Sequence, residues 1–280
     1  MKLTLLGTSA WNPIPAPWCS CRVCETARNS GGKNVRKHAS CLINDDTLVD
    51  FGPDIFTQCC EHNVDLRRVD RILQTHSHND HLAPALLLSR VRPKVEKPLR
   101  LFSNREVQQR ILEVCNAEKR ALGFSFPVNF EELGILPVTA QPGEELSDGP
   151  MRILPIRAQH VDDETALNWL VTGPDGKKLL ILNDTGWWAD DSWELVRGRC
   201  ADAAVIEVTT GFQQGRCAHL GCGAALEFLE KLQKIDALKS GATLATTHVN
   251  HLSGATQEEF EAFFSARGIS AGYDGMELVF

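Results

Sequence analysis

The stretch Thr75-His76-Ser77-His78-Asn79-Asp80-His81 places three imidazoles and one carboxylate within six residues. It directly follows Val69-Asp70-Arg71-Ile72-Leu73-Gln74, whose apolar centre predicts a buried strand. Because open sheets present functional side chains at the ends of their strands, we expect this cluster at the rim of a sheet. Imidazole and carboxylate together suit zinc, manganese or iron, so the stretch predicts one open metal site or two adjacent ones. The alternative is a polar surface loop that happens to be rich in histidine.

The composition is that of a globular protein with a large core, since 43% of the 280 residues are hydrophobic and 23% are charged. The formal net charge of −7 argues against nucleic acid as a partner. No run approaches the roughly 20 apolar residues of a membrane span, and the N-terminus lacks a signal pattern. We see no repeat or linker and therefore expect one domain over residues 1–280, with a homodimer left open.

The ten cysteines are scattered, which indicates free thiols or thiolate metal sites in a reducing cytoplasm rather than a disulfide framework. Three of them stand close together in Cys19-Ser20-Cys21-Arg22-Val23-Cys24, after a proline-rich stretch that cannot be helical. This spacing predicts three thiolates of a structural zinc site that lacks its fourth ligand. Unrelated thiols are the alternative.

Several elements can be predicted from hydrophobic periodicity and turn residues. We expect hairpins over residues 40–51, 166–182 and 270–280, the last turning at Asp274-Gly275. We expect helices over residues 83–91, 106–122, 223–232 and 256–266, the last with Thr256 and Glu259 in capping-box spacing. The basic run 33–38 could contact phosphate, but the pattern favours a solvated face.

Four apolar strands are followed directly by histidine or aspartate: Gln74-Thr75-His76, Gln159-His160, Leu182-Asn183-Asp184 and Thr247-His248. One such histidine is usually a structural residue, but four beside an H-x-H-x-D-H run are harder to explain in that way. If the strands lie in layered sheets, seven metal-binding side chains gather at one rim. That number is enough for two metals roughly 3.5 Å apart, as in two-metal hydrolases.

The run His76-Ser77-His78-Asn79-Asp80-His81, together with His160, Asp184 and His248, resembles the metallo-β-lactamase fold hydrolases. The resemblance implies an α/β protein built as an αβ/βα four-layer sandwich. It also implies two catalytic divalent metals, with zinc, manganese and iron as the candidates, and a hydroxide between them that attacks the substrate. The implied ligands are His76, His78 and His160 for the first metal, Asp80, His81 and His248 for the second, and Asp184 as the bridge.

The cysteine run is similar to that of the PhnP-type phosphoribosyl 1,2-cyclic phosphate phosphodiesterase subfamily. This resemblance implies that His251 completes a structural zinc site with Cys19, Cys21 and Cys24. It also implies that His219 opens a late helix and donates a proton to the leaving group or binds phosphate, with Asp80 and Asp184 orienting the nucleophile. The alternative for His219 is a simple helix cap. The implied substrate is a small, ribosyl cyclic phosphodiester.

Other functions remain open at this point. A lactone or thioester hydrolase would use the same metals, and an RNA 3′-processing nuclease shares the fold, although the acidic charge counts against it. A non-enzymatic relative, in cofactor biosynthesis or as a metal-binding scaffold, is a further alternative. Trp11, Trp18, Trp187 and Trp188 lie in loops beside proposed ligands and either line the substrate site or pack the loops.

Overall fold

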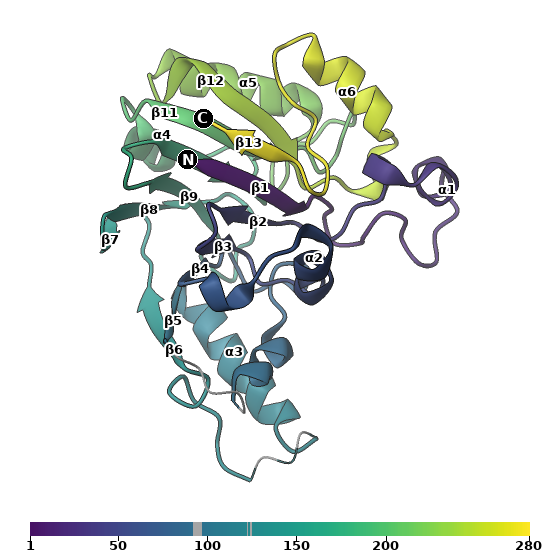
Figure 1. The fold of residues 1–280 in the computed structure, drawn as a ribbon. Helices are drawn as coiled ribbons and strands as arrows, with labels where there is room; N and C mark the ends of the chain where they lie inside the picture. Colours follow the sequence, from purple (N-terminus) through teal and green to yellow (C-terminus); the bar gives the residue numbers. More distant parts are fainter. Residues whose placement is uncertain (92–96, 122, 124) are drawn as a thin grey trace.

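The strands form two mixed sheets in a computed structural model that describes residues 1–91, 97–121, 123 and 125–280 (Figure 1). In the described part of the chain one sheet has seven strands in the order β13-β1-β2-β3-β4-β5-β6. Its strands are β1 Lys2–Gly7, β2 Ser40–Ile43, β3 Thr47–Val49, β4 Arg71–Leu73, β5 Leu99–Ser103, β6 Ile135–Thr139 and β13 Glu277–Val279. The other has six strands in the order β12-β11-β10-β9-β8-β7. These are β7 Leu146–Asp148, β8 Met151–Arg157, β9 Leu167–Thr172, β10 Lys178–Leu182, β11 Ala201–Glu207 and β12 Leu238–Thr247.

The two sheets pack face to face because successive side chains of each strand point to opposite faces. In β10, Leu179 and Ile181 point inward and join a core with residues of β1, β4 and β5. Leu180 and Leu182 of the same strand point outward, against a second core that includes the helices on that side. A sheet that is apolar on both faces must be covered on both, which requires a layered sandwich.

Helices cover the outer faces of both sheets (Figure 1). Beside the six-stranded sheet lie α4 Asp190–Val196, α5 Cys222–Lys234 and α6 Gln257–Ser265. The seven-stranded sheet is covered by α2 Ile55–His62, α3 Arg105–Glu118 and the 3₁₀ helix η3 Pro84–Arg90. The predicted αβ/βα four-layer sandwich is confirmed. No helix within the described ranges has the length and apolar character needed to cross a membrane.

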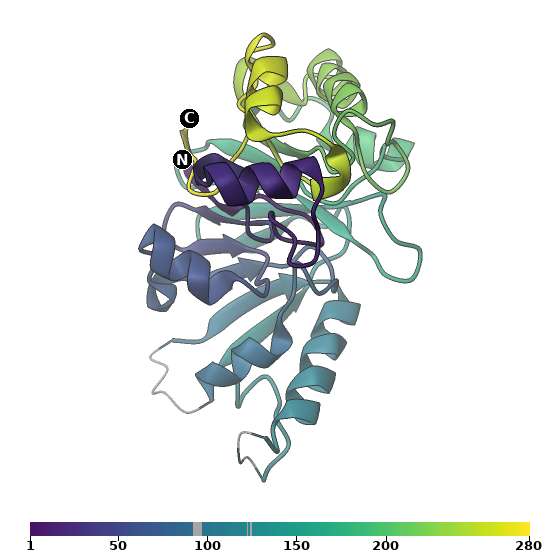
Figure 2. The same cartoon turned by 90° about the vertical axis from the view of Figure 1, so that its right-hand side faces the viewer.

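The N-terminal helix α1 Arg22–Ser30 lies beside α6, although the two are far apart in sequence (Figure 2). Arg22 Nη1 donates to Glu259 Oε1 at 3.0 Å, across this contact. The short 3₁₀ helix η4 His251–Ser253 lies close to α1 as well. The N-terminal loop is therefore attached to the end of the chain that follows β12.

Two predicted hairpins are confirmed, since β2 pairs antiparallel with β3 and β9 with β10. The predicted hairpin over residues 270–280 is wrong. Ser270 bridges Ala245 in the six-stranded sheet, whereas β13 pairs with β1 in the seven-stranded one, so the final segment passes from one sheet to the other.

The helix expected over residues 83–91 is a 3₁₀ helix. The capping box of Thr256 and Glu259 is confirmed at the start of α6, and the predicted end of α3 at Leu122 lies outside the described residues.

Candidate metal centre

Two groups of potential metal ligands meet where β4, β8, β10 and β12 end. The strands β10, β11 and β12 run parallel, so their carboxyl ends reach the same edge. One group contains His76, His78, His160 and Asp184, and the other contains Asp80, His81, His248 and Asp184. In each group the ligand atoms all lie within 4.8 Å of one another. The structure thus brings together all seven predicted ligands, with Asp184 shared by both groups.

The carboxylate of Asp184 lies at the centre of this arrangement. Its Oδ2 is 3.0 Å from His81 Nε2, 3.3 Å from His76 Nε2 and 3.6 Å from His160 Nε2. Its other oxygen, Oδ1, is 2.9 Å from His248 Nδ1. One oxygen therefore lies near ligands of both groups, as a bridging ligand requires.

The arrangement of the donor atoms suits divalent cations better than it suits hydrogen bonds between the side chains. His160 Nε2 lies 3.2 Å from His78 Nδ1, and His81 Nε2 lies 3.0 Å from His248 Nε2, so imidazole nitrogens face each other in pairs. Among the described residues, the buried atoms His76 Nε2, Asp80 Oδ1 and Asp184 Oδ1 make no hydrogen bond, although His76 Nε2 and Asp184 Oδ1 lie close to an oppositely charged group. Buried polar atoms without partners are costly, and cations between them would satisfy them. Imidazole and carboxylate are suitable ligands for zinc, manganese and iron.

The pKa values of the histidines differ between the two groups. Burial lowers the pKa of His78 and lowers that of His160 to about 3, so both rings are neutral and have lone pairs available. Burial would also lower the pKa of His81, but Asp184 and Asp80 raise it well above its ordinary value. Despite burial, the same carboxylates raise the pKa of His248 to about 9. A cation at the second group therefore replaces protons, as metal binding to protonated ligands requires.

Two buried carboxylates that the sequence analysis missed hold the ligands in place. Asp50 Oδ2 lies 2.7 Å from His81 Nδ1, and Asp50 Oδ1 accepts hydrogen bonds from Thr75 N and Thr75 Oγ1. Glu207, at the end of β11, accepts from Thr209 Oγ1, which lies 2.8 Å from His248 Nδ1. Such partners fix the orientation of a metal-binding imidazole. The signal was available, because a lone acidic residue ends each of these apolar strands.

His219 belongs to the same rim and does not cap a helix. The helix α5 begins at Cys222 with Gly221 as its N-cap, so the expectation that His219 opens it is wrong. Instead, His219 Nδ1 lies 3.0 Å from Glu207 Oε1 and 3.6 Å from Asp184 Oδ1. Burial would lower the pKa of His219, but Glu207 raises it above its ordinary value. The ring is stacked on that of His248, with centroids 5.9 Å apart.

The backbone of the rim is unusual at the residues that turn these side chains toward one another. Asp50, Asp184 and His248 all adopt positive φ, at 63°, 40° and 56°. Residues other than glycine rarely do so, and such positions cluster at functional sites. At Gly186 a Cβ would lie 1.3 Å from Cys217 O, so only glycine allows the loop after Asp184 to approach the loop before His219.

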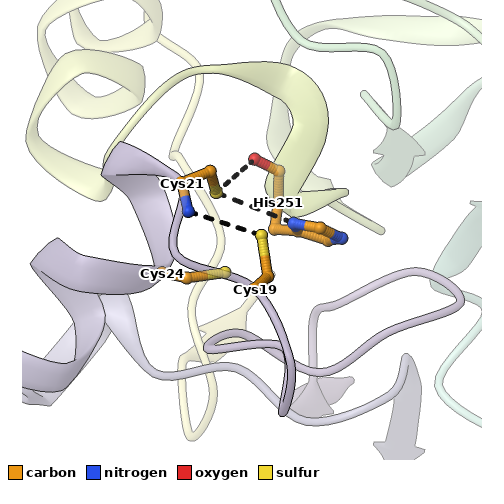
Figure 3. A group of neighbouring side chains, drawn as sticks. All are labelled: Cys19, Cys21, Cys24 and His251. Atoms are coloured by element: carbon orange, nitrogen blue, oxygen red, sulfur yellow. Dashed lines mark hydrogen bonds between the residues drawn. The ribbon is translucent and has the colours of Figure 1, made fainter.

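The predicted Cys3His group is also assembled (Figure 3). The ligand atoms of Cys19, Cys21, Cys24 and His251 all lie within 4.8 Å of one another, and Cys21 Sγ is 3.7 Å from His251 Nδ1. Burial would raise the pKa of Cys21, but hydrogen bonds from the Cys24 backbone and His251 lower it to about 6. Three thiols and one imidazole are a typical donor set for structural zinc.

The basic run and the tryptophans have separate roles. Lys33 pairs with Glu261, Lys37 with Glu61 and His38 with Asp54. Arg36 is 3% exposed and donates to Thr8 and Gly272, so this run is structural rather than a solvated face.

The four loop tryptophans differ in their surroundings. Trp188 is buried in the outer core with Trp187 packed against it, Trp18 is fully exposed, and Trp11 lies beside His78.

Two facing mixed sheets with a rim of histidine and aspartate define a metallo-β-lactamase fold. A family model described as the beta-lactamase superfamily domain matches residues 46–248, and the chain belongs to this superfamily. No curated protein matches the chain.

Three solved structures share its fold over essentially the whole length. One is a diphosphatase from the PhnP family, with 19% identity, a TM-score of 0.74 and coverage of 99% of this chain and 96% of that one. Zinc-bound PqqB from Methylobacterium extorquens has 18% identity and a TM-score of 0.70, with 100% of both chains covered. The short form of human tRNase Z has 17% identity and a TM-score of 0.68, with 100% of this chain and 99% of that one covered.

Asp50→Asn should weaken metal binding without removing a ligand, because Asp50 orients His81. We expect metal affinity to fall about 10- to 100-fold, measured by competition with a chelator. The control is Asp45→Asn, which changes a carboxylate in an exposed pair with Arg68. Equal metal affinity of the Asp50 variant and the parent would remove the orienting role.

Cys21→Ala should release one zinc per chain and lower the melting temperature, because the remaining ligands no longer close a tetrahedron. Elemental analysis and thermal unfolding measure the two effects. Cys60→Ala, at an exposed thiol outside the group, should change neither. A Cys21 variant with unchanged zinc content and stability would contradict a structural zinc site.

Proposed function

We propose that the chain is a metal-dependent hydrolase that cleaves a small phosphodiester. The observation that carries the proposal is the shared Asp184 carboxylate between two ligand groups, with His219 beside it. When bound, two divalent cations supply a nucleophile from water at neutral pH and neutralise charge on the phosphate oxygens. The Cys3His group and the fold shared with a PhnP-family diphosphatase support phosphoester chemistry over other hydrolysis.

The residues of the chain divide the remaining tasks. Asp184 and Asp80 are buried carboxylates whose pKa values lie well below the ordinary range, because His81 and His248 outweigh the effect of burial. Both stay ionised at neutral pH and can accept hydrogen bonds from the attacking water. This orients the water toward phosphorus.

His219 is the proton donor in this proposal. Its side chain is 29% exposed, so it can reach a substrate at the rim, and Glu207 holds its Nδ1. A general acid works best with a pKa near the working pH, and the carboxylate of Glu207 favours the protonated ring. Glu207 is therefore a positioning residue, and His219 transfers the proton to the departing alkoxide.

The substrate class follows from the resemblance of the cysteine run to the PhnP-type phosphodiesterases. We propose that the substrate is a small molecule, with a ribosyl 1,2-cyclic phosphate as the first compound to test. We also propose that the protein acts in the cytoplasm. The metals are zinc or manganese, with iron as a further candidate. A homodimer and the absence of a nucleic-acid partner stay predictions.

A lactone or thioester hydrolase is the main rival, because the same cations would activate water toward a carbonyl carbon. A nuclease like tRNase Z shares the fold, but the net charge of −7 does not favour binding of RNA. A scaffold with purely structural metals would close its coordination shells with protein ligands, whereas seven ligands shared by two metals leave positions for water.

A substrate panel tests the proposed function directly. With both metals loaded, we expect turnover of bis-p-nitrophenyl phosphate and of a ribosyl cyclic phosphate to exceed that of an aryl lactone and a thioester. Removal of the metals with a chelator should abolish the activity, and their return should restore it. A preference for the lactone or the thioester would replace phosphodiester hydrolysis with carbonyl chemistry.

His219→Ala should keep both metals but lose about 10²- to 10⁴-fold in kcat on an alkyl phosphodiester, because a poor leaving group needs a proton. The loss should be much smaller with p-nitrophenolate as leaving group. Glu207→Gln removes the carboxylate that raises the pKa of His219. The pH above which turnover of the alkyl substrate falls should therefore shift to a lower value.

The control for this experiment is His62→Ala, because His62 lies on α2 and contacts Leu6 O rather than the rim. Metal content is measured for every variant. Equal losses of His219→Ala on the alkyl and aryl substrates would exclude proton donation as its role.

A further inference from the structure

Trp11 combines exposure with proximity to a metal ligand. Its side chain is 55% exposed, although a large aromatic ring gains free energy from burial. Its ring centroid lies 6.4 Å from that of His78, with the two planes at 83°. The ring therefore lies at the rim of the candidate site and is open to solvent there.

The backbone around Trp11 is held by hydrogen bonds on both sides. His38 Nε2 lies 3.1 Å from Trp11 O, and His38 Nδ1 lies 2.6 Å from Asp54 Oδ2. On the preceding residue, Ala10 N donates to Val249 O at 3.0 Å. On the following residue, Asn12 O accepts from Ser9 Oγ. These bonds hold the backbone from which the exposed ring projects.

The loop is also attached to the ligand strand itself. Val249 directly follows His248, and Ser9 pairs with Val249 through an isolated bridge. Trp11 thus keeps a constant position relative to ligands of both groups, His78 of the first and His248 of the second. An exposed aromatic ring this close to His78 is suited to contact the group next to the phosphate.

We propose that Trp11 is a specificity-determining residue that stacks on a flat ring carried by the ester group of the substrate. The proposal rests on the proposed function of small phosphodiester hydrolysis and narrows its substrate class: it favours a phosphodiester whose ester group carries a flat ring over an unsubstituted ribosyl 1,2-cyclic phosphate. A nucleobase or an aryl group is the ring class that an exposed indole recognises by stacking. The metals and His219 would take the phosphate, and Trp11 would take the ring.

The other loop tryptophans do not fit this role. Trp188 is 2% exposed, and Trp187 packs on Phe228 and carries the Arg216 guanidinium at 3.7 Å. Trp18 is fully exposed but has no ring contact with a ligand imidazole in the part of the chain described. Trp18 is therefore a matched control, because it is an exposed indole of the same loop.

The test is calorimetric binding of three phosphate monoesters to the metal-loaded full chain, which does not depend on turnover. We expect the parent to bind phenyl phosphate more tightly than methyl or cyclohexyl phosphate. Trp11→Ala should weaken phenyl phosphate about five- to tenfold and change the other two less than about twofold. Trp11→Phe should retain most of the preference, and Trp18→Ala should leave all three affinities unchanged.

Three results would overturn the proposal. The first is a parent that does not prefer phenyl phosphate, and the second is a Trp11→Ala variant that keeps the preference. The third is an equal loss for phenyl and cyclohexyl phosphate, which would indicate an unspecific apolar contact. The proposed function fails separately, in the substrate panel, because binding of the monoesters does not require hydrolysis of a diester.

Discussion

Buried negative charge at the rim is the constraint on which the rest of the structure depends. Asp50, Asp80, Asp184 and Glu207 are each at most 4% exposed, and within the described residues their ion pairs are with histidines. Carboxylates are costly to bury unless positive charge balances them. Protonated imidazoles at His81 and His248 supply part of that balance, and two divalent cations would supply it more fully while releasing the protons. The same electrostatics therefore favour the binding of divalent cations at this rim.

The sandwich fold gathers these charged side chains because it brings strand ends from both sheets to one edge. Sheet strands are rigid, and their carboxyl ends place side chains more accurately than long loops can. The N-terminal loop is then fixed to the same edge twice. Ser9 and Ala10 bond to Val249, and the Cys3His group connects the cysteine loop to His251, only three residues beyond His248. The candidate structural site thus stabilises the segment that carries the candidate metal ligand His248, through one short stretch of backbone.

Most of the site could be predicted from the sequence because each ligand directly follows an apolar strand, a local pattern that survives folding. His160, Asp184 and His248 were found in this way, whereas Asp50 and Glu207 were hidden because they were counted as strand residues. The closing hairpin failed for a different reason. Local turn chemistry at Asp274-Gly275 is the same whether the two arms pair with each other or with different sheets, and only long-range packing decides between them. The prediction for His219 failed similarly, because its contact with Glu207 depends on how the loop before His219 packs against Gly186, which local sequence does not determine.

The basic residues of the chain decide how a phosphate must be recognised under the proposed function. The basic run of the N-terminal loop is engaged elsewhere, since Lys33, Arg36 and Lys37 contact Glu261, Gln257 and Glu61. They are therefore held in structural contacts and contribute little to an anion in the site. Under the proposed function the cations and His219 take the charge of the phosphate, which is common to all phosphoesters. Contacts with the attached group can then distinguish one phosphoester from another, and an exposed indole beside His78 is the kind of contact that can provide this discrimination.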